Sequence, residues 1–130
     1  MTGVQTCALP ISFHRHRAAG AAQSATNDSH LLLLTYAAEC GLKCLLLRQR
    51  GLHSTKRLDD DDMTHDLNQL LQKVGSSDRF AACQTDPLDV PITSERLHQA
   101  FRYGARLQAP DRGGFANRLH QVLGWLEESI

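Results

Sequence analysis

One segment limits what this chain can fold into more than any other. Residues 30–51 read HLLLLTYAAECGLKCLLLRQRG, and apolar side chains lie on nearly every face of a helix built from them. A helix that is apolar almost all round is buried among other elements. The polar residues at 26–29 are good N-caps, and Gly51 suits a C-terminal stop. We therefore expect one central helix surrounded by further helices.

A narrow polar stripe runs along this expected helix. Thr35, Glu39 and Lys43 follow one another at intervals of four residues, which places them on one face. Glu39 and Lys43 are in the favourable order for an ion pair, and two charges argue against a membrane span. The pair has two interpretations. It either packs against a neighbouring helix, or it lines a groove that supports proton transfer or ligand binding.

The remaining apolar patterns predict four more helices. We expect them at residues 13–25, 63–74, 93–107 and 115–128, with residues 76–91 as an irregular connection. Pro110 and the Gly113-Gly114 pair are expected to break the chain before the last helix. No run shows the alternation that indicates a strand. The sequence therefore predicts an all-α protein, a bundle of four to five helices.

Composition narrows the classes of function. The 130 residues include 14 Lys and Arg and 14 Asp and Glu, so the formal net charge is zero with His neutral. Nucleic-acid binding would therefore need a local basic patch. The four cysteines lack metal-ligand spacing, and the acidic run Asp59–Asp62 lacks the spacing of a calcium loop. We expect a cytoplasmic protein with no cofactor, no bound metal and no attachment to a membrane.

The first twelve residues, MTGVQTCALPIS, carry no charge and no helical period. They lack the basic start of a signal peptide and are too short and too polar for a transmembrane helix. The segment resembles a translated sequencing adapter. We therefore expect residues 1–12 to be a non-native leader and residues 13–130 to form a single domain.

Three blocks of this sequence, in this order, resemble HEPN-type helical domains. The first is YAAECGLK, from Tyr36 to Lys43; the second is HDLNQL, from His65 to Leu70; the third is Arg102-Tyr103. The resemblance implies an up-and-down bundle of four or five helices that is often dimeric. The family includes metal-independent endoribonucleases and toxins of toxin–antitoxin or phage-defence systems. Other members have lost catalysis and bind nucleotides or nucleic acid.

The chain departs from the catalytic members, which carry Arg and His with four to six residues between them late in the sequence. Arg48 and His53 have such a spacing, but they lie at the end of the central helix. We therefore expect a module that binds RNA, a nucleotide or a partner protein such as an antitoxin, and that acts without catalysis. The alternatives are a metal-independent endoribonuclease with a variant site and a helical scaffold without a ligand.

Six residues are the candidates for a site. The candidate catalytic residues are Glu39, His65 and Arg102, and the candidate ligand-binding residues are Lys43, Asp66, Arg102 and Tyr103. Histidine exchanges protons near neutral pH, arginine matches phosphate geometry, and an aromatic ring stacks on a base. Each also has a structural interpretation: His65 and Asp66 suit the start of a helix, and Tyr103 suits a core position with Arg102 as its ion-paired neighbour.

Overall fold

The structure is a computed structural model that describes residues 9–22, 29–51, 64–86, 91–93, 96–102 and 106–129. Within these ranges it is mostly helical. The helices are α1 (Leu9–Ala22), α2 (Ser29–Gln49), α3 (Leu67–Lys73), α4 (Leu97–Arg102) and α5 (Ala109–Ser129). The strands are β1 (Cys83–Asp86), β2 (Pro91–Ile92) and β3 (Arg106–Leu107).

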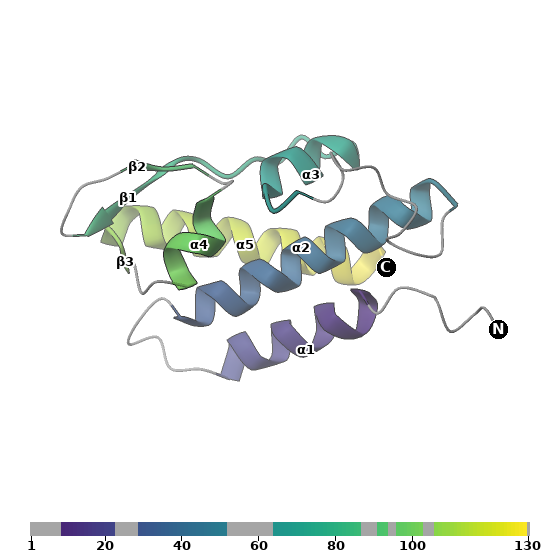
Figure 1. The fold of residues 1–130 in the computed structure, drawn as a ribbon, viewed down its shortest axis with the longest axis horizontal. Helices are drawn as coiled ribbons and strands as arrows, with labels where there is room; N and C mark the ends of the chain where they lie inside the picture. Colours follow the sequence, from purple (N-terminus) through teal and green to yellow (C-terminus); the bar gives the residue numbers. More distant parts are fainter. Residues whose placement is uncertain are drawn as a thin grey trace.

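Helix α2 is the centre of the fold, as its sequence predicts. It contacts each of the other four helices, and α1 and α5 lie along it while α4 and the strands gather at one end (Figure 1). Leu31, Leu42 and Leu46 are completely or almost completely buried. By length and hydropathy residues His30–Gln49 would also suit a membrane span, but 67% of the window is buried inside the fold. The apolar character of α2 is thus used for packing between helices.

The polar residues of α2 are also accommodated inside the bundle. Thr35 is buried, and its hydroxyl donates to the carbonyl oxygen of Leu31 at 2.6 Å. A hydroxyl that bonds one turn back needs no partner from another element. The helix ends at Gln49, and Gly51 follows it as the glycine that the sequence predicts at this stop: it has a φ of 67° and donates its N–H to the carbonyl of Arg48.

A small sheet corrects the prediction of an all-α fold. The strand order is β2-β1-β3, and β1 pairs antiparallel with both neighbours. Cys83 lies opposite Ile92, and Thr85 lies opposite Leu107. Strands of two to four residues are too short to show alternation in the sequence. Strand β3 lies inside the stretch that was predicted as one helix from 93 to 107, and only Leu97–Arg102 of that stretch is assigned to α4.

Two helices begin earlier than predicted. Helix α5 begins at Ala109, so the expected break at Pro110 and Gly113-Gly114 is wrong. Proline fits the first turn of a helix, where its missing N–H costs nothing, and glycine inside a helix costs only about 1 kcal/mol. Helix α1 begins at Leu9, so its first turn belongs to the segment that was expected to be a leader. Helix α3 is shorter than expected and starts at Leu67.

Candidate functional site

Three of the predicted site residues meet in one cluster. Glu39 and Lys43 are one turn apart on α2, and the Lys43 ammonium donates to Oε2 of Glu39 at 3.0 Å. His65, which precedes α3, has its Nδ1 2.8 Å from the other carboxylate oxygen of Glu39. A carboxylate only accepts hydrogen bonds, so the hydrogen of this contact is on Nδ1. Both oxygens of Glu39 are therefore engaged within the chain.

The three side chains of this cluster differ in how far they are buried. The side chains of Lys43 and Glu39 are only 7% and 12% exposed, whereas that of His65 is 55% exposed. A buried ammonium needs a carboxylate beside it, because an unpaired charge away from water is costly. Glu39 and Lys43 thus form a structural ion pair, and His65 is the member of the cluster that a solvent-borne molecule can touch.

Asp66 has a structural position. Its Oδ1 accepts the backbone N–H of Asn68 at 3.0 Å, and its own N–H donates to the hydroxyl of Thr64. Asp66 is the N-cap of α3, which satisfies an amide that the helix leaves without a partner. The interpretation of His65-Asp66 as the start of a helix is therefore confirmed for Asp66.

The third predicted block lies largely beyond what the structure describes. Arg102 ends α4, but its side chain is outside the described part, and Tyr103 is wholly outside it. His53 also lies outside the described residues, so the Arg48–His53 spacing has no geometry to examine. Arg48 itself contacts the carbonyl oxygen of Ser129 at 3.4 Å.

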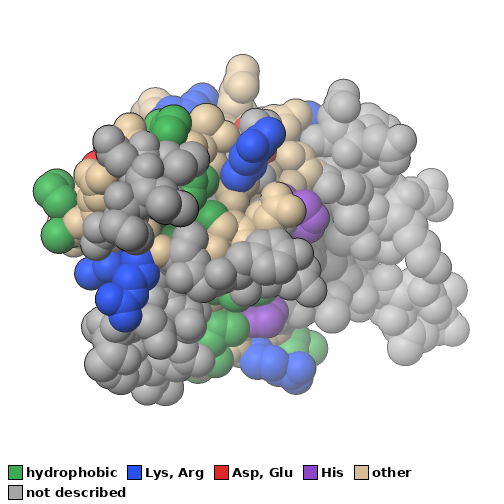
Figure 2. Space-filling view, turned by 60° about the vertical axis from the view of Figure 1, so that its left-hand side comes forward, with side chains coloured by type: hydrophobic (Ala, Val, Ile, Leu, Met, Phe, Trp, Pro, Cys, Tyr) green, Lys and Arg blue, Asp and Glu red, His purple; other side chains and the backbone are tan. Residues whose placement is uncertain are grey.

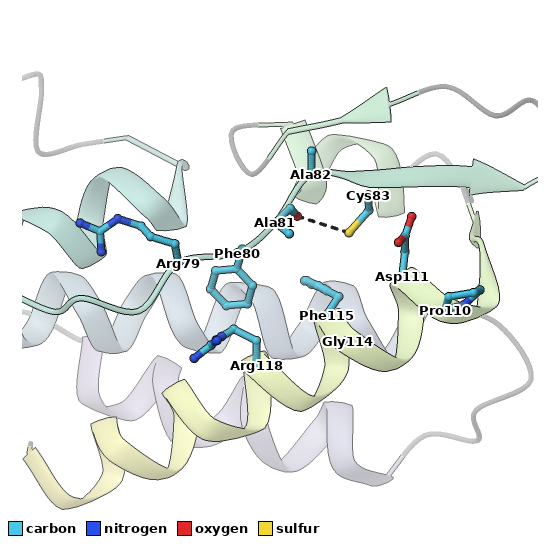
Figure 3. A pocket seen from close by; sticks show the side chains of 10 residues that line it. All are labelled: Arg79, Phe80, Ala81, Ala82, Cys83, Pro110, Asp111, Gly114, Phe115 and Arg118. Atoms are coloured by element: carbon cyan, nitrogen blue, oxygen red, sulfur yellow. Dashed lines mark hydrogen bonds between the residues drawn. The ribbon is translucent and has the colours of Figure 1, made fainter.

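The structure also contains a cleft that the sequence analysis did not predict. It has a volume of about 200 Å³ and lies between the extended segment 79–83 and the first half of α5. Figure 3 shows Phe80 and Phe115 at its middle, Asp111 and Pro110 toward one end and Arg118 toward the other. The residues that line it are Arg79, Phe80, Ala81, Ala82, Cys83, Pro110, Asp111, Gly114, Phe115 and Arg118.

Side chains from two helices fix the segment 79–83 in place. The Asn68 side chain on α3 forms two bonds with the backbone of Phe80: its Oδ1 accepts the N–H at 2.7 Å and its Nδ2 donates to the carbonyl at 2.9 Å. On the other side, Asp111 of α5 accepts the backbone N–H of Gln84 at 2.6 Å. The segment is thus held between α3 and α5 by hydrogen bonds. The fold therefore fixes the position of this wall of the cleft.

Two polar side chains that line the cleft, Arg118 and Cys83, are not activated for chemistry. Arg118 is 3.0 Å from Asp78 in an ion pair that is partly open to solvent. Burial, with a smaller contribution from the negative charge of Asp111, raises the pKa of the Cys83 thiol to about 11. A thiol with such a pKa is protonated at neutral pH and is a poor nucleophile.

The signal for this cleft exists in the sequence. Asp111, Gly114, Phe115 and Arg118 recur at intervals of three and four residues, which puts them on one face of a continuous helix. The expectation that Gly113-Gly114 breaks the chain hid this spacing, because it assigned Asp111 and Phe115 to different elements.

Among the described residues no group of three or more His, Cys, Asp or Glu side chains is placed to hold a metal ion. Comparisons of the chain with models of protein families, with curated proteins and with solved structures found no match.

Proposed function

We propose that this chain is a HEPN-like helical module that binds a nucleotide or RNA and has no hydrolytic activity of its own. One observation carries the proposal: the cleft beside α5 offers a place for a ligand but no activated group. Its thiol is protonated, its carboxylate accepts a backbone N–H, and Arg118 is paired with a carboxylate. General acid–base or nucleophilic catalysis needs a base beside an activated nucleophile, and the described residues that line the cleft supply no such pair.

The surface at this end of the molecule supports an anionic ligand. The face in Figure 2 is the end that carries the sheet and α4, turned toward the viewer, and among its described residues blue Lys and Arg surface far exceeds red Asp and Glu surface. The whole chain is neutral, and the basic side chains described on this face stand apart from one another in the view of Figure 2, so they offer an anion single contacts.

The HEPN-like part of the proposal rests on the sequence blocks and on the central position of α2. From the same resemblance we propose a cytoplasmic protein that takes part in a toxin–antitoxin or phage-defence system. A partner protein such as an antitoxin, or a second copy of the chain, belongs to this proposal.

The binding proposal is tested with the full chain in excess chelator. Fluorescence anisotropy with labelled RNA oligonucleotides, and calorimetric titration with nucleotides, should detect binding, while the RNA stays intact on a denaturing gel. Binding that weakens steeply with added salt supports phosphate recognition. A folded protein that binds neither RNA nor any nucleotide contradicts the proposal and leaves the helical scaffold.

A second function, metal-independent RNA cleavage, is favoured by one contact. Glu39 fixes Nδ1 of the exposed His65 at 2.8 Å, and a carboxylate that fixes one ring nitrogen orients the imidazole for acid–base chemistry. If this function is correct, RNA is cleaved in excess chelator and the activity is lost in His65→Ala. The matched control is His120→Ala, because His120 is an exposed histidine on α5. Intact RNA with the wild-type chain rejects this function.

A further inference from the structure

One face of α5 forms a wall of the cleft with opposite charges at its two ends. Asp111 and Arg118 are seven residues apart, which is two helical turns, so they lie on the same face about 10 Å apart along the axis. Gly114 and Phe115 lie between them on that face. A ligand that lies along this wall meets a carboxylate at one end, an apolar middle and a guanidinium at the other.

The middle of the wall leaves room for a flat group. A Cβ atom added at Gly114 would have no neighbour within 4 Å, so the space above this glycine is open. Ala81, Ala82 and Phe115 supply apolar surface around it. The volume of about 200 Å³ is below the usual range for drug-sized ligands and large cofactors, which starts at about 300 Å³. The cleft therefore suits one planar ring with the rest of the ligand outside.

The two ends define what the ligand must carry. Only Oδ2 of Asp111 accepts the Gln84 N–H, and a carboxylate has acceptor capacity on both oxygens, so this end calls for an N–H donor. Arg118 uses Nη1 for Asp78, and its side chain is 39% exposed. A guanidinium has five N–H donors and matches phosphate geometry, so this end calls for a phosphate.

We propose that the cleft binds a nucleoside monophosphate whose base carries an exocyclic amino group. The base lies over Gly114 and donates from its amino group to Asp111, while the phosphate lies against Arg118. This inference rests on the proposed function, because it names the ligand class and the place of nucleotide binding. It involves none of the residues that the sequence analysis selected.

The test uses the full chain and calorimetric titration with AMP, IMP and adenosine. IMP carries an oxygen where AMP carries the amino group, so it should bind about tenfold more weakly, as expected for the loss of one hydrogen bond. Adenosine lacks the phosphate and should also bind more weakly than AMP. In Arg118→Gln the affinity for AMP should fall to that for adenosine, whereas the affinity for adenosine should stay unchanged.

Two glycine-to-leucine variants test whether the nucleotide binds in this cleft. Gly114→Leu fills the cleft, and Gly113→Leu is the matched control, because Gly113 lies next to it on α5, is equally open and does not line the cleft. Leucine favours helix over glycine at both positions, so both variants should fold. We expect Gly114→Leu to weaken AMP binding at least about tenfold more than Gly113→Leu does.

The outcomes separate this inference from the function on which it rests. Equal affinities for AMP and IMP, or equal effects of the two glycine variants, overturn the inference. RNA binding without AMP binding overturns it as well but leaves the proposed module. Absence of binding to every nucleotide and RNA rejects both.

Discussion

At the scale of single residues, Glu39 is the side chain whose loss should have the largest effect on the α2 cluster. Glu39→Leu leaves the Lys43 ammonium, with a side chain only 7% exposed, without its carboxylate. Breaking a buried ion pair from one side costs about 3–5 kcal/mol, whereas replacing both partners by apolar residues is often neutral. Urea unfolding should therefore show a large loss for Glu39→Leu and recovery of most of it in Glu39→Leu/Lys43→Met. A single variant as stable as the wild type would contradict the structural role of the pair.

Cys83 gives a prediction about pH. Because the pKa of its thiol is raised from 9.0 to about 11, the folded state retains the proton more tightly than the unfolded chain. The stabilisation from the protonated thiol is complete below pH 9 and is lost as the pH rises toward 11. The difference in unfolding free energy between the wild type and Cys83→Ala should thus shrink between pH 9 and pH 11. A difference that stays constant across this range would show that the thiol titrates normally.

At the scale of elements, three helices meet at Gly41. A Cβ atom added there would lie 2.8 Å from Cδ1 of Phe13 on α1 and 2.8 Å from Cδ1 of Leu126 on α5, and both side chains are fully buried. Overpacking of this kind costs about 1–3 kcal/mol, which exceeds the gain of up to about 1 kcal/mol from helix propensity. Gly41→Ala should therefore lower the free energy of unfolding.

Gly124→Ala is the control for this prediction. Gly124 is also helical, but a Cβ atom there meets nothing within 4 Å, so alanine should stabilise α5 by up to about 1 kcal/mol. Denaturant unfolding of both variants separates packing from propensity. If Gly41→Ala is stabilised like Gly124→Ala, the close approach of α1 and α5 to α2 is wrong.

Some of the elements could be predicted from the sequence and others could not. The buried α2, its polar stripe and the glycine that follows its end, Gly51, follow from hydrophobic periodicity and glycine conformation, and these predictions are confirmed. The short strands do not follow from the sequence, because contacts between distant residues decide them, whereas the early start of α5 was hidden by the expected break at Gly113-Gly114. Asp111 accepts the N–H of Gln84 from a distant part of the chain, and local propensity contains no trace of this contact. The Glu39–His65 contact likewise joins residues that are 26 positions apart.

At the scale of the whole molecule, α1 is the layer that covers α2. It lies along α2 (Figure 1), and Phe13 on its inner face is completely buried. Arg17 also forms an ion pair with Glu127, which links α1 to α5. Covering an apolar helix removes its surface from water, and that is the main favourable contribution to folding. The integrity of the fold should therefore depend on α1 from Phe13 onward.

Stepwise shortening of the chain tests this dependence and the expected leader together. Residues 9–12 form the first turn of α1, and Ile11 in that turn is 63% exposed. Removal of residues 1–12 keeps Phe13 and should leave a cooperatively folded helical protein. Removal of residues 1–22 deletes α1 and uncovers α2, and an exposed apolar patch of that kind leads to association. Circular dichroism with size-exclusion chromatography should show a monodisperse peak for the first variant and aggregation for the second. Loss of folding already after removal of residues 1–12 would show that these residues belong to the domain, because the fold would then need the part of α1 that they form.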